Sequence, residues 1–231
     1  MSTVLITGAN RGLGLEFCRQ YAQAGWTIFA CCRVPKAADA LHDLAASFPS
    51  ISIHQLEVTD FPRVDALARE LAAKAVDVLL CNAAIYGDES GKRFGSIDYG
   101  RWTDTFRINT QAPVKLVEAF LPHLLRSQRK LVVAISSLMG SMTDNRGGGS
   151  IYYRSSKAAL NAAMKSLSID LKPQCVGVLI LHPGWVKTDM GGSNAPTEPT
   201  ESIGGMIAVI DAFRSEQSGR FVNFRGEELP W

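Results

Sequence analysis

The sequence lacks any long apolar run, and its charges of opposite sign are almost balanced. No apolar stretch approaches the roughly 18 residues that a membrane-spanning helix requires, so no membrane association is expected. The 231 residues carry 24 basic and 22 acidic side chains, a net charge of +2, with no long run of like charge. A chain with so little excess charge and no basic arm is not expected to bind nucleic acid.

Cysteine and histidine are scarce and are not arranged for metal binding. The five cysteines form no CxxC pair and the four histidines are dispersed, so no metal site is predicted. Because the cysteines are odd in number and have apolar neighbours, we expect them to be buried free thiols. The first seven residues lack the basic segment and cleavage site of a signal peptide, which predicts a cytoplasmic location.

Short apolar runs alternate with helical stretches along the whole chain, without an internal repeat. The length and the hydrophobic content of 46% suit one globular domain over residues 1–231. Strand candidates are Val4–Thr7, Thr27–Cys32, Ile51–Leu56, Val76–Cys81, Leu131–Ile135, Val176–Leu181 and Arg220–Asn223; helical candidates are Leu13–Ala24, Pro35–Ser47, Pro62–Ala75, Ile97–Arg126, Tyr153–Leu171 and Ser202–Arg214. Apolar strands separated by helices belong in a parallel sheet covered on both faces. The predicted fold is a single doubly wound α/β sheet of Rossmann type.

Two segments are expected to be mobile loops. Ser141–Ser150 ("SMTDNRGGGS") and Gly191–Thr200 ("GGSNAPTEPT") are rich in glycine, proline, serine and asparagine. Loops of this kind often carry specificity, so both are candidates for the rim of a binding site.

The stretch "VLITGANRGLG", residues 4–14, places three glycines directly after the first apolar run. In a strand-to-helix turn, glycines let backbone N–H groups approach a pyrophosphate, which then lies at a helix N-terminus. The glycines Gly8, Gly12 and Gly14 depart from the commoner G-x-G-x-x-G spacing, and a tight turn without a ligand is the alternative. Their position after the first strand of an α/β chain favours a dinucleotide site.

The second strand ends at Arg33, where NAD-binding sites commonly carry an acidic residue for the ribose hydroxyls. A second cation, Arg11, lies inside the glycine-rich turn. Two guanidinium groups near the adenosine ribose suit a 2′-phosphate, although each alone could be a solvated surface side chain. The pair therefore predicts NADP(H) rather than NAD(H).

A candidate acid/base unit lies in "YYRSSK", where Tyr153 and Lys157 are four residues apart and would share one face of a helix. A nearby ammonium would lower the tyrosine pKa from its usual value of about 10. Ser137 follows the apolar run Leu131–Ile135, and the carboxyl end of that strand would face the ligand crevice. Its hydroxyl could bind a carbonyl oxygen, and a role in a turn or helix cap is the alternative.

Taken together, these motifs resemble those of the short-chain dehydrogenase/reductase family, with a closer likeness to its C-factor and sniffer-like carbonyl reductase branch. The likeness spans essentially the whole chain and comprises "TGANRGLG", "CNAAIYG", "INT", "ISSLMGS", "YYRSSK", "HPGWVKTDMGG" and "GEELPW". The second motif departs from the family pattern at Cys81 and Ala84. Glu57 stands where the family usually has aspartate, and the separation of Ser137 from Tyr153 is a few residues longer than the commonest spacing.

The resemblance implies that nicotinamide exchanges a hydride with a carbonyl or alcohol carbon. Tyr153 would protonate the developing alkoxide, and Lys157 would tune Tyr153 and hold the nicotinamide ribose. Ser137 would bind the carbonyl oxygen, and Asn109 would hold a water in the proton relay. The residues implied to bind NADP(H) are Gly8, Asn10, Arg11, Gly12, Leu13, Gly14, Arg33, Glu57, Val58, Asn82, Ala83, Ala84, Tyr153, Lys157, Pro183, Gly184, Val186 and Thr188.

The alternative function is a cofactor-sensing regulator of the same fold that binds NADP without catalysis. Such a protein would tend to lose the tyrosine or the lysine, and both are present here. An epimerase or dehydratase of the extended branch would need a larger C-terminal substrate domain.

The expected partner is a small carbonyl compound bound near Trp185 and Gly191–Thr200. Pairing through the long helices into a homodimer or homotetramer is a further expectation, although small monomers occur in the family.

Overall fold

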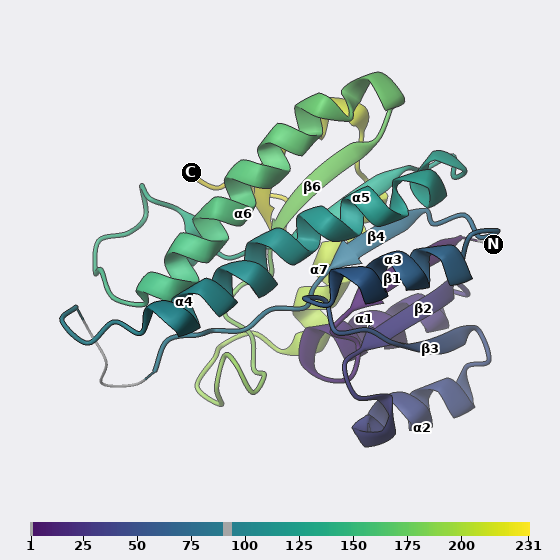
Figure 1. Cartoon of the computed structure of the whole chain (residues 1–231), viewed down its shortest axis with the longest axis horizontal. Helices are drawn as coiled ribbons and strands as arrows, with labels where there is room; N and C mark the ends of the chain where they lie inside the picture. The colour runs from purple at the N-terminus through teal and green to yellow at the C-terminus, as the bar shows by residue number, and fades with distance from the viewer. Residues whose placement is uncertain (1, 90–93) are drawn as a thin grey trace.

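Within the part of the chain that the structure describes, a seven-stranded parallel sheet forms the middle layer (Figure 1). The computed structural model describes residues 2–89 and 94–231. The strands are β1 (Thr3–Thr7), β2 (Thr27–Cys32), β3 (Ile51–Gln55), β4 (Val78–Cys81), β5 (Leu131–Ile135), β6 (Gly177–His182) and β7 (Arg220–Asn223). They are ordered β3-β2-β1-β4-β5-β6-β7. The order reverses between β1 and β4, where doubly wound sheets open a crevice for ligands.

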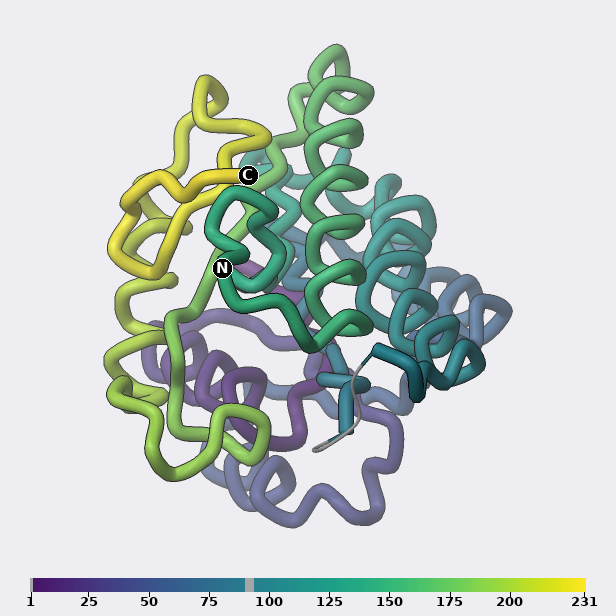
Figure 2. Tube along the Cα trace, turned by 90° about the vertical axis from the view of Figure 1, so that its left-hand side faces the viewer, coloured from purple at the N-terminus to yellow at the C-terminus, as the bar shows by residue number. Residues whose placement is uncertain are grey.

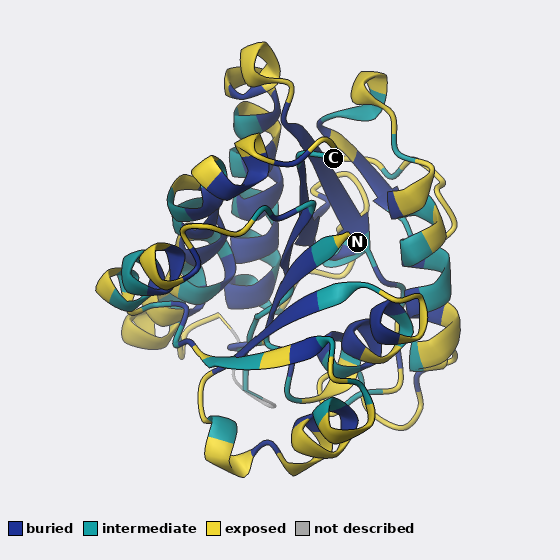
Figure 3. Ribbon diagram, turned by 90° about the vertical axis from the view of Figure 1, so that its right-hand side faces the viewer, coloured by how far each residue is buried: buried dark blue, intermediate teal, exposed yellow. Residues whose placement is uncertain are grey.

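Helices cover both faces of this sheet. The helices α1 (Gly12–Gln23), α2 (Asp39–Ser47) and α7 (Pro199–Asp211) pack on one face; α3 (Phe61–Glu70), α5 (Ala112–Leu125) and α6 (Ile151–Asp170) pack on the other. Along β1, Val4 and Ile6 enter the first layer and Leu5 enters the second, as strand alternation requires. The inner strands are therefore almost wholly buried, whereas the edge strand β3 is largely half-buried or exposed (Figure 3). This covered parallel sheet confirms the predicted Rossmann-type fold. No described helix is long and apolar enough to cross a membrane.

The predicted helices are present, but two of them are interrupted. The predicted helix over 97–126 consists of α4 (Tyr99–Phe106), a π-helical turn at Arg107–Gln111, and α5. Pro113 accounts for part of this irregularity, because it has no N–H to donate to the carbonyl of Asn109 four residues earlier. The predicted helix over 35–47 begins as a short 3₁₀ turn at Pro35–Ala37 before α2.

The prediction of buried thiols is correct for four cysteines and wrong for Cys175. Cys18, Cys31, Cys32 and Cys81 are buried free thiols, whereas Cys175 is exposed. Cys175 lies in the turn that leads into β6 and has a left-handed φ of 58°. Its apolar neighbours enter the sheet, but the turn itself lies at the surface. Among residues 2–89 and 94–231, no group of three or more His, Cys, Asp or Glu side chains could hold a metal ion.

The segments that carry the candidate site residues leave the sheet at one edge. The strands β1, β2, β4, β5 and β6 are parallel, so their carboxyl ends lie side by side. The loop after β5 also meets the last residues of the chain (Figure 2), where the Thr143 N–H donates to the Trp231 carbonyl at 3.0 Å. The sheet therefore gathers residues that are far apart in the sequence into one region.

Candidate active site

The turn between β1 and α1 is shaped to accept an anion. Gly8 and Gly12 have left-handed φ values of 68° and 55°, which glycine adopts without steric cost. A Cβ on Gly14 would lie 2.1 Å from the Gly8 carbonyl oxygen, so no larger residue fits there. Among the described residues, α1 has no side-chain cap from Arg11 and no acidic residue in its first turn. Its first N–H groups therefore suit a pyrophosphate.

Asn82 and Ala83, at the end of β4, hold the glycine-rich turn in place. The Asn82 side-chain amide donates to the carbonyl oxygens of Thr7 at 2.9 Å and Gly8 at 3.3 Å. The backbone N–H groups of Asn82 and Ala83 both donate to Thr7 Oγ1 at 3.1 Å. The structure therefore brings these two implied cofactor residues directly beside the turn, and Ala84 follows them.

Each of the two candidate phosphate-binding arginines faces a carboxylate. Arg11 Nη1 lies 2.6 Å from Asp189 Oδ2, with side chains 71% and 76% exposed. Arg33 Nη1 lies 3.7 Å from Glu57 Oε2, with side chains 75% and 36% exposed. Ion pairs this exposed contribute little free energy, so either guanidinium can exchange its partner for a phosphate at small cost. Sequence reasoning missed Asp189, which is 178 residues from Arg11.

The Pro183–Thr188 segment lies across from the glycine-rich turn. A Cβ on Gly12 would lie 3.6 Å from Thr188 Cγ2, which places the two segments close together. Gly184 has a left-handed φ of 85°, and Val186 is buried and forms a bridge with Thr197. The end of this segment therefore lies beside the glycine-rich turn.

The expected loop Gly191–Thr200 is folded against this segment. Trp185 Nε1 donates to the Gly191 carbonyl at 2.7 Å, and Ala195 is buried with 1% of its surface exposed. Pro199 already begins α7. The mobility of this segment remains a prediction.

Ser137, Tyr153 and Lys157 come together at the carboxyl end of β5. The Ser137 hydroxyl lies close enough to the Tyr153 hydroxyl to lower the pKa of Tyr153. Lys157 is buried, with 2% of its surface exposed, and its Nζ donates to the Ile135 carbonyl at 2.8 Å. The same Nζ lies 5.7 Å from the centroid of the Tyr153 ring. The arrangement gathers a phenol, a hydroxyl and an amine at the edge of the sheet from which the glycine-rich turn also leaves.

Burial controls the protonation of this cluster. It raises the pKa of Tyr153 to about 12; the Ser137 hydroxyl acts in the opposite direction, and Tyr86 raises the pKa further. Burial likewise lowers the pKa of Lys157 to about 8. The predicted lowering of the Tyr153 pKa is therefore wrong for this structure, because desolvation of the phenolate outweighs the other contributions. The phenol is held in its proton-donating form.

Asn109 lies in the π-helical turn and is 1% exposed. Its Nδ2 donates to the Ile85 carbonyl at 2.8 Å and to Ser156 Oγ at 3.0 Å, and its Oδ1 accepts from the Ile85 N–H at 2.9 Å. The side chain thus ties the segment after β4 to α6. The water-holding role that the resemblance implies for Asn109 stays a prediction.

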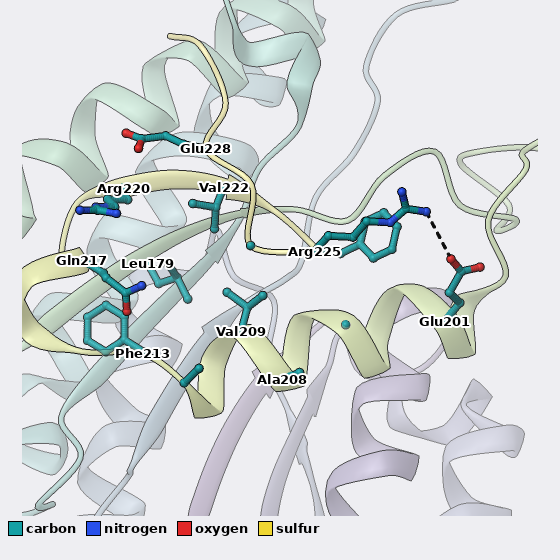
Figure 4. A pocket seen from close by; sticks show the side chains of 14 residues that line it. Leu179, Glu201, Ala208, Val209, Phe213, Gln217, Arg220, Val222, Arg225 and Glu228 are labelled. Atoms are coloured by element: carbon teal, nitrogen blue, oxygen red, sulfur yellow. Dashed lines mark ion pairs between the residues drawn. The ribbon is translucent and has the colours of Figure 1, made fainter.

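A separate cavity of about 560 Å³ lies between α7, β7 and the chain that follows β7 (Figure 4). Its wall is largely apolar, with Val209, Phe213 and Val222, and Arg225 lies 3.7 Å from Glu201 at its rim. The described residues that line it include none of the implied catalytic or cofactor-binding residues. The candidate active site is therefore the cluster at the carboxyl edge of the sheet.

The chain is similar to known proteins over most or all of its length. A family model for short chain dehydrogenases matches residues 2–199. The C-signal protein of Myxococcus xanthus is 42% identical over 166 residues, which is 72% of this chain and 99% of that protein. The 1-hydroxy-2-glutathionyl-2-methyl-3-butene dehydrogenase of a Rhodococcus species is 36% identical over 239 residues, with both chains fully covered.

Two solved structures share the whole fold. The carbonyl reductase Sniffer of D. melanogaster superposes with a TM-score of 0.94 at 37% identity, covering 100% of both chains. An NADPH-bound carbonyl reductase from chicken fatty liver gives a TM-score of 0.91 at 34% identity, covering 100% of this chain and 99% of the other. At these identities, the two structures resemble this chain in sequence as well as in fold.

Proposed function

Because the chain belongs to the short-chain dehydrogenase family, a family of oxidoreductases, we propose that it is an NADPH-dependent carbonyl reductase. The observation that carries this proposal is the buried cluster of Ser137, Tyr153 and Lys157 at the same edge of the sheet as the glycine-rich turn. The likeness to two carbonyl reductases, one of them NADPH-bound, supports the direction of the reaction and the cofactor. We take residues 1–231 as one domain.

The residues present fit a phosphorylated dinucleotide. The uncapped start of α1 suits the pyrophosphate, and Arg11 and Arg33 suit a 2′-phosphate. Lys157 would contact the nicotinamide ribose, and the segment from Pro183 would lie beside the nicotinamide. The bound cofactor supplies the hydride that reduces the carbonyl carbon.

In the proposed mechanism, Ser137 orients the carbonyl oxygen by hydrogen bonding. Tyr153 donates its phenolic proton to that oxygen as negative charge develops there. The raised pKa of about 12 keeps the phenol protonated until the transfer. Lys157, with a pKa of about 8, then stabilises the phenolate left behind whenever its amine is protonated.

The decisive experiment measures NADPH consumption across aldehydes, ketones, diketones and quinones, together with NADPH binding by calorimetry. A reductase consumes NADPH with at least one of these carbonyls, and Tyr153→Phe abolishes most of that turnover while binding survives. A protein that binds NADPH tightly but reduces none of them would instead be a cofactor-sensing regulator.

A cytoplasmic location and pairing into a homodimer or homotetramer stay predictions.

A further inference from the structure

The segment Tyr86–Asp88, between β4 and α4, contacts the first turn of the helix that carries Tyr153. Asp88 Oδ1 accepts from the Tyr152 N–H at 3.2 Å, and Asp88 Oδ2 accepts from the Tyr153 N–H at 2.9 Å. First-turn N–H groups have no partner inside their own helix. The N-cap residue of α6, Ser150, makes no capping hydrogen bond with its own side chain among the described residues. The cap of α6 therefore comes from a distant part of the chain.

Tyr86 covers the Tyr153 ring. The two ring centroids lie 4.9 Å apart with an interplanar angle of 34°. Tyr86 is 37% exposed and Tyr153 is 8% exposed, so Tyr86 is the more solvent-exposed ring of this pair. The Tyr86 hydroxyl also shares a 2.7 Å hydrogen bond with Ser150 Oγ. One side chain thus contacts both the phenol ring and the residue that begins α6.

Ser150 is held in a strained conformation at the end of the loop after β5. Its φ of 46° is left-handed, which a non-glycine residue adopts only when its surroundings fix it. Gly148 and Gly149 before it also have left-handed φ values, 61° and 66°, and a Cβ on either would meet open space. The hydrogen bond between Tyr86 and Ser150 therefore holds the point at which this loop enters α6.

The segment is itself anchored on α4. Gly87 is buried with a φ of 78°, and a Cβ on it would lie 2.2 Å from Thr105 Oγ1. Arg101 Nε donates to the Gly87 carbonyl at 2.5 Å. Because these contacts with α4 hold Gly87, its neighbours Tyr86 and Asp88 are held as well. They therefore resist a displacement of the first turn of α6.

We propose that Tyr86 and Asp88 are positioning residues for Tyr153. Asp88 fixes the backbone of the first turn of α6, and Tyr86 fixes the phenol ring and the entry of the preceding loop. The effect on rate rests on the proposed function, whereas the effect on the helix is a property of the free protein. Without these contacts, the first turn of α6 opens and the phenol leaves its place beside Ser137.

The test of Asp88 compares Asp88→Ala with Asp88→Asn, which keeps an acceptor oxygen. In Asp88→Ala, amide exchange at residues 151–153 of the free protein accelerates, and kcat at saturating NADPH falls by about 10- to 100-fold, the scale of a small misplacement of a reacting group. Asp88→Asn keeps most of the parental exchange protection at residues 151–153 and most of the parental kcat. Asp60→Ala is the matched control: Asp60 Oδ1 caps α3 by accepting from the Arg63 N–H at 3.1 Å, and its loss leaves exchange at 151–153 and kcat unchanged.

The test of Tyr86 uses a double-mutant cycle. Tyr86→Phe and Ser150→Ala each remove the same hydrogen bond, so their losses in kcat are equal and the double variant loses no more than either. Tyr86→Ala also uncovers Tyr153, which lowers its pKa from about 12. The part of the alkaline limb of the kcat profile that follows Tyr153, above the Lys157 transition near 8, therefore moves to lower pH. A purely structural role would change stability and leave that limb in place.

Parental exchange rates and parental kcat in Asp88→Ala would overturn the role of Asp88. Additive losses in the Tyr86 and Ser150 variants, or an unmoved alkaline limb in Tyr86→Ala, would overturn the role of Tyr86. If the parent protein reduces no carbonyl, the proposed function fails instead. The exchange comparison then still decides whether Asp88 holds the first turn of α6.

Discussion

The implied cofactor half and the catalytic half of the candidate site differ in how far their charged and polar side chains are buried. Arg11 and Arg33, on the implied cofactor side, have side chains about three-quarters exposed, 71% and 75%. Tyr153 and Lys157, on the catalytic side, are 8% and 2% exposed. Exposed ion pairs exchange partners at little cost, which suits recognition of a ligand that must also leave. Buried polar groups cannot reorganise easily, which suits charge stabilisation during a reaction.

Substitution of the buried half should give the largest effect. Tyr153→Phe removes the proton donor and keeps the ring, so carbonyl reduction should fall by roughly 10²–10⁴-fold, the usual contribution of a positioned acid. NADPH affinity should survive, because the glycine-rich turn and the arginines are unchanged. Steady-state kinetics and calorimetry on the same preparation check both parts. Parental turnover in Tyr153→Phe would remove that residue from the mechanism.

Lys157→Met should be at least as damaging as Tyr153→Phe. It removes the charge that stabilises the phenolate and, in the proposed mechanism, a contact to the nicotinamide ribose. NADPH binding should therefore weaken along with kcat, which separates the two variants. A Lys157→Met protein with full NADPH affinity and full turnover would contradict both assigned roles.

In the exposed half, Arg33→Asp should weaken NADPH binding by about 1–3 kcal/mol, the scale for losing a charge-assisted partner. The new carboxylate would also face Glu57, the present partner of Arg33 at 3.7 Å. NADH binding should be unchanged or tighter, because NADH carries no 2′-phosphate. Calorimetry with both cofactors checks this, and a parent protein that binds NADH as tightly as NADPH would contradict the predicted preference.

Burial of His182, at the end of β6, should make folding stability depend on pH. Burial lowers its pKa to about 4, with Asp144 acting in the opposite direction. Above the unfolded value of about 6.5, the stabilising neutral form is fully present, and it is lost as pH falls toward 4. Because the His182 ring is partly accessible, the free energy of unfolding should fall by about 1–2 kcal/mol over that pH range. Urea unfolding at pH 4.5 and pH 7 should show a smaller difference in His182→Asn than in the parent.

The local pattern of the sequence predicted the sheet and its order of elements because each strand is apolar and each glycine motif follows a strand. It also placed Ser137 after a strand and Tyr153 and Lys157 on one helix, as the structure has them, since strand ends and helix spacing define these positions. The start of α6 was predicted two residues late, at Tyr153 instead of Ile151. The cap that permits the earlier start is Asp88, and a cap supplied across the fold leaves no local signal.

Electrostatic partners were the least predictable part of the site. The spacing of Tyr153 and Lys157 indicated a lowered tyrosine pKa, but the amount of burial is a property of the packed fold. In the same way, the sequence shows that Arg11 and Arg33 are cations, but it does not show which carboxylates face them in the fold. Asp189 faces Arg11 only because β1 and β6 end at the same edge of the sheet.

The smallest effect should come from Asp189, and it tests whether the exposed half really exchanges partners. Asp189→Asn removes the carboxylate that lies 2.6 Å from Arg11 Nη1 and also removes a charge that would repel a 2′-phosphate. Both changes act in the same direction, so NADPH should bind more tightly, by at most about 1 kcal/mol for a pair this exposed. The gain should shrink at high salt and be absent for NADH. Weaker NADPH binding in Asp189→Asn would mean that this carboxylate supports the bound state, and the contrast between an exchangeable and a fixed half would fail at Arg11.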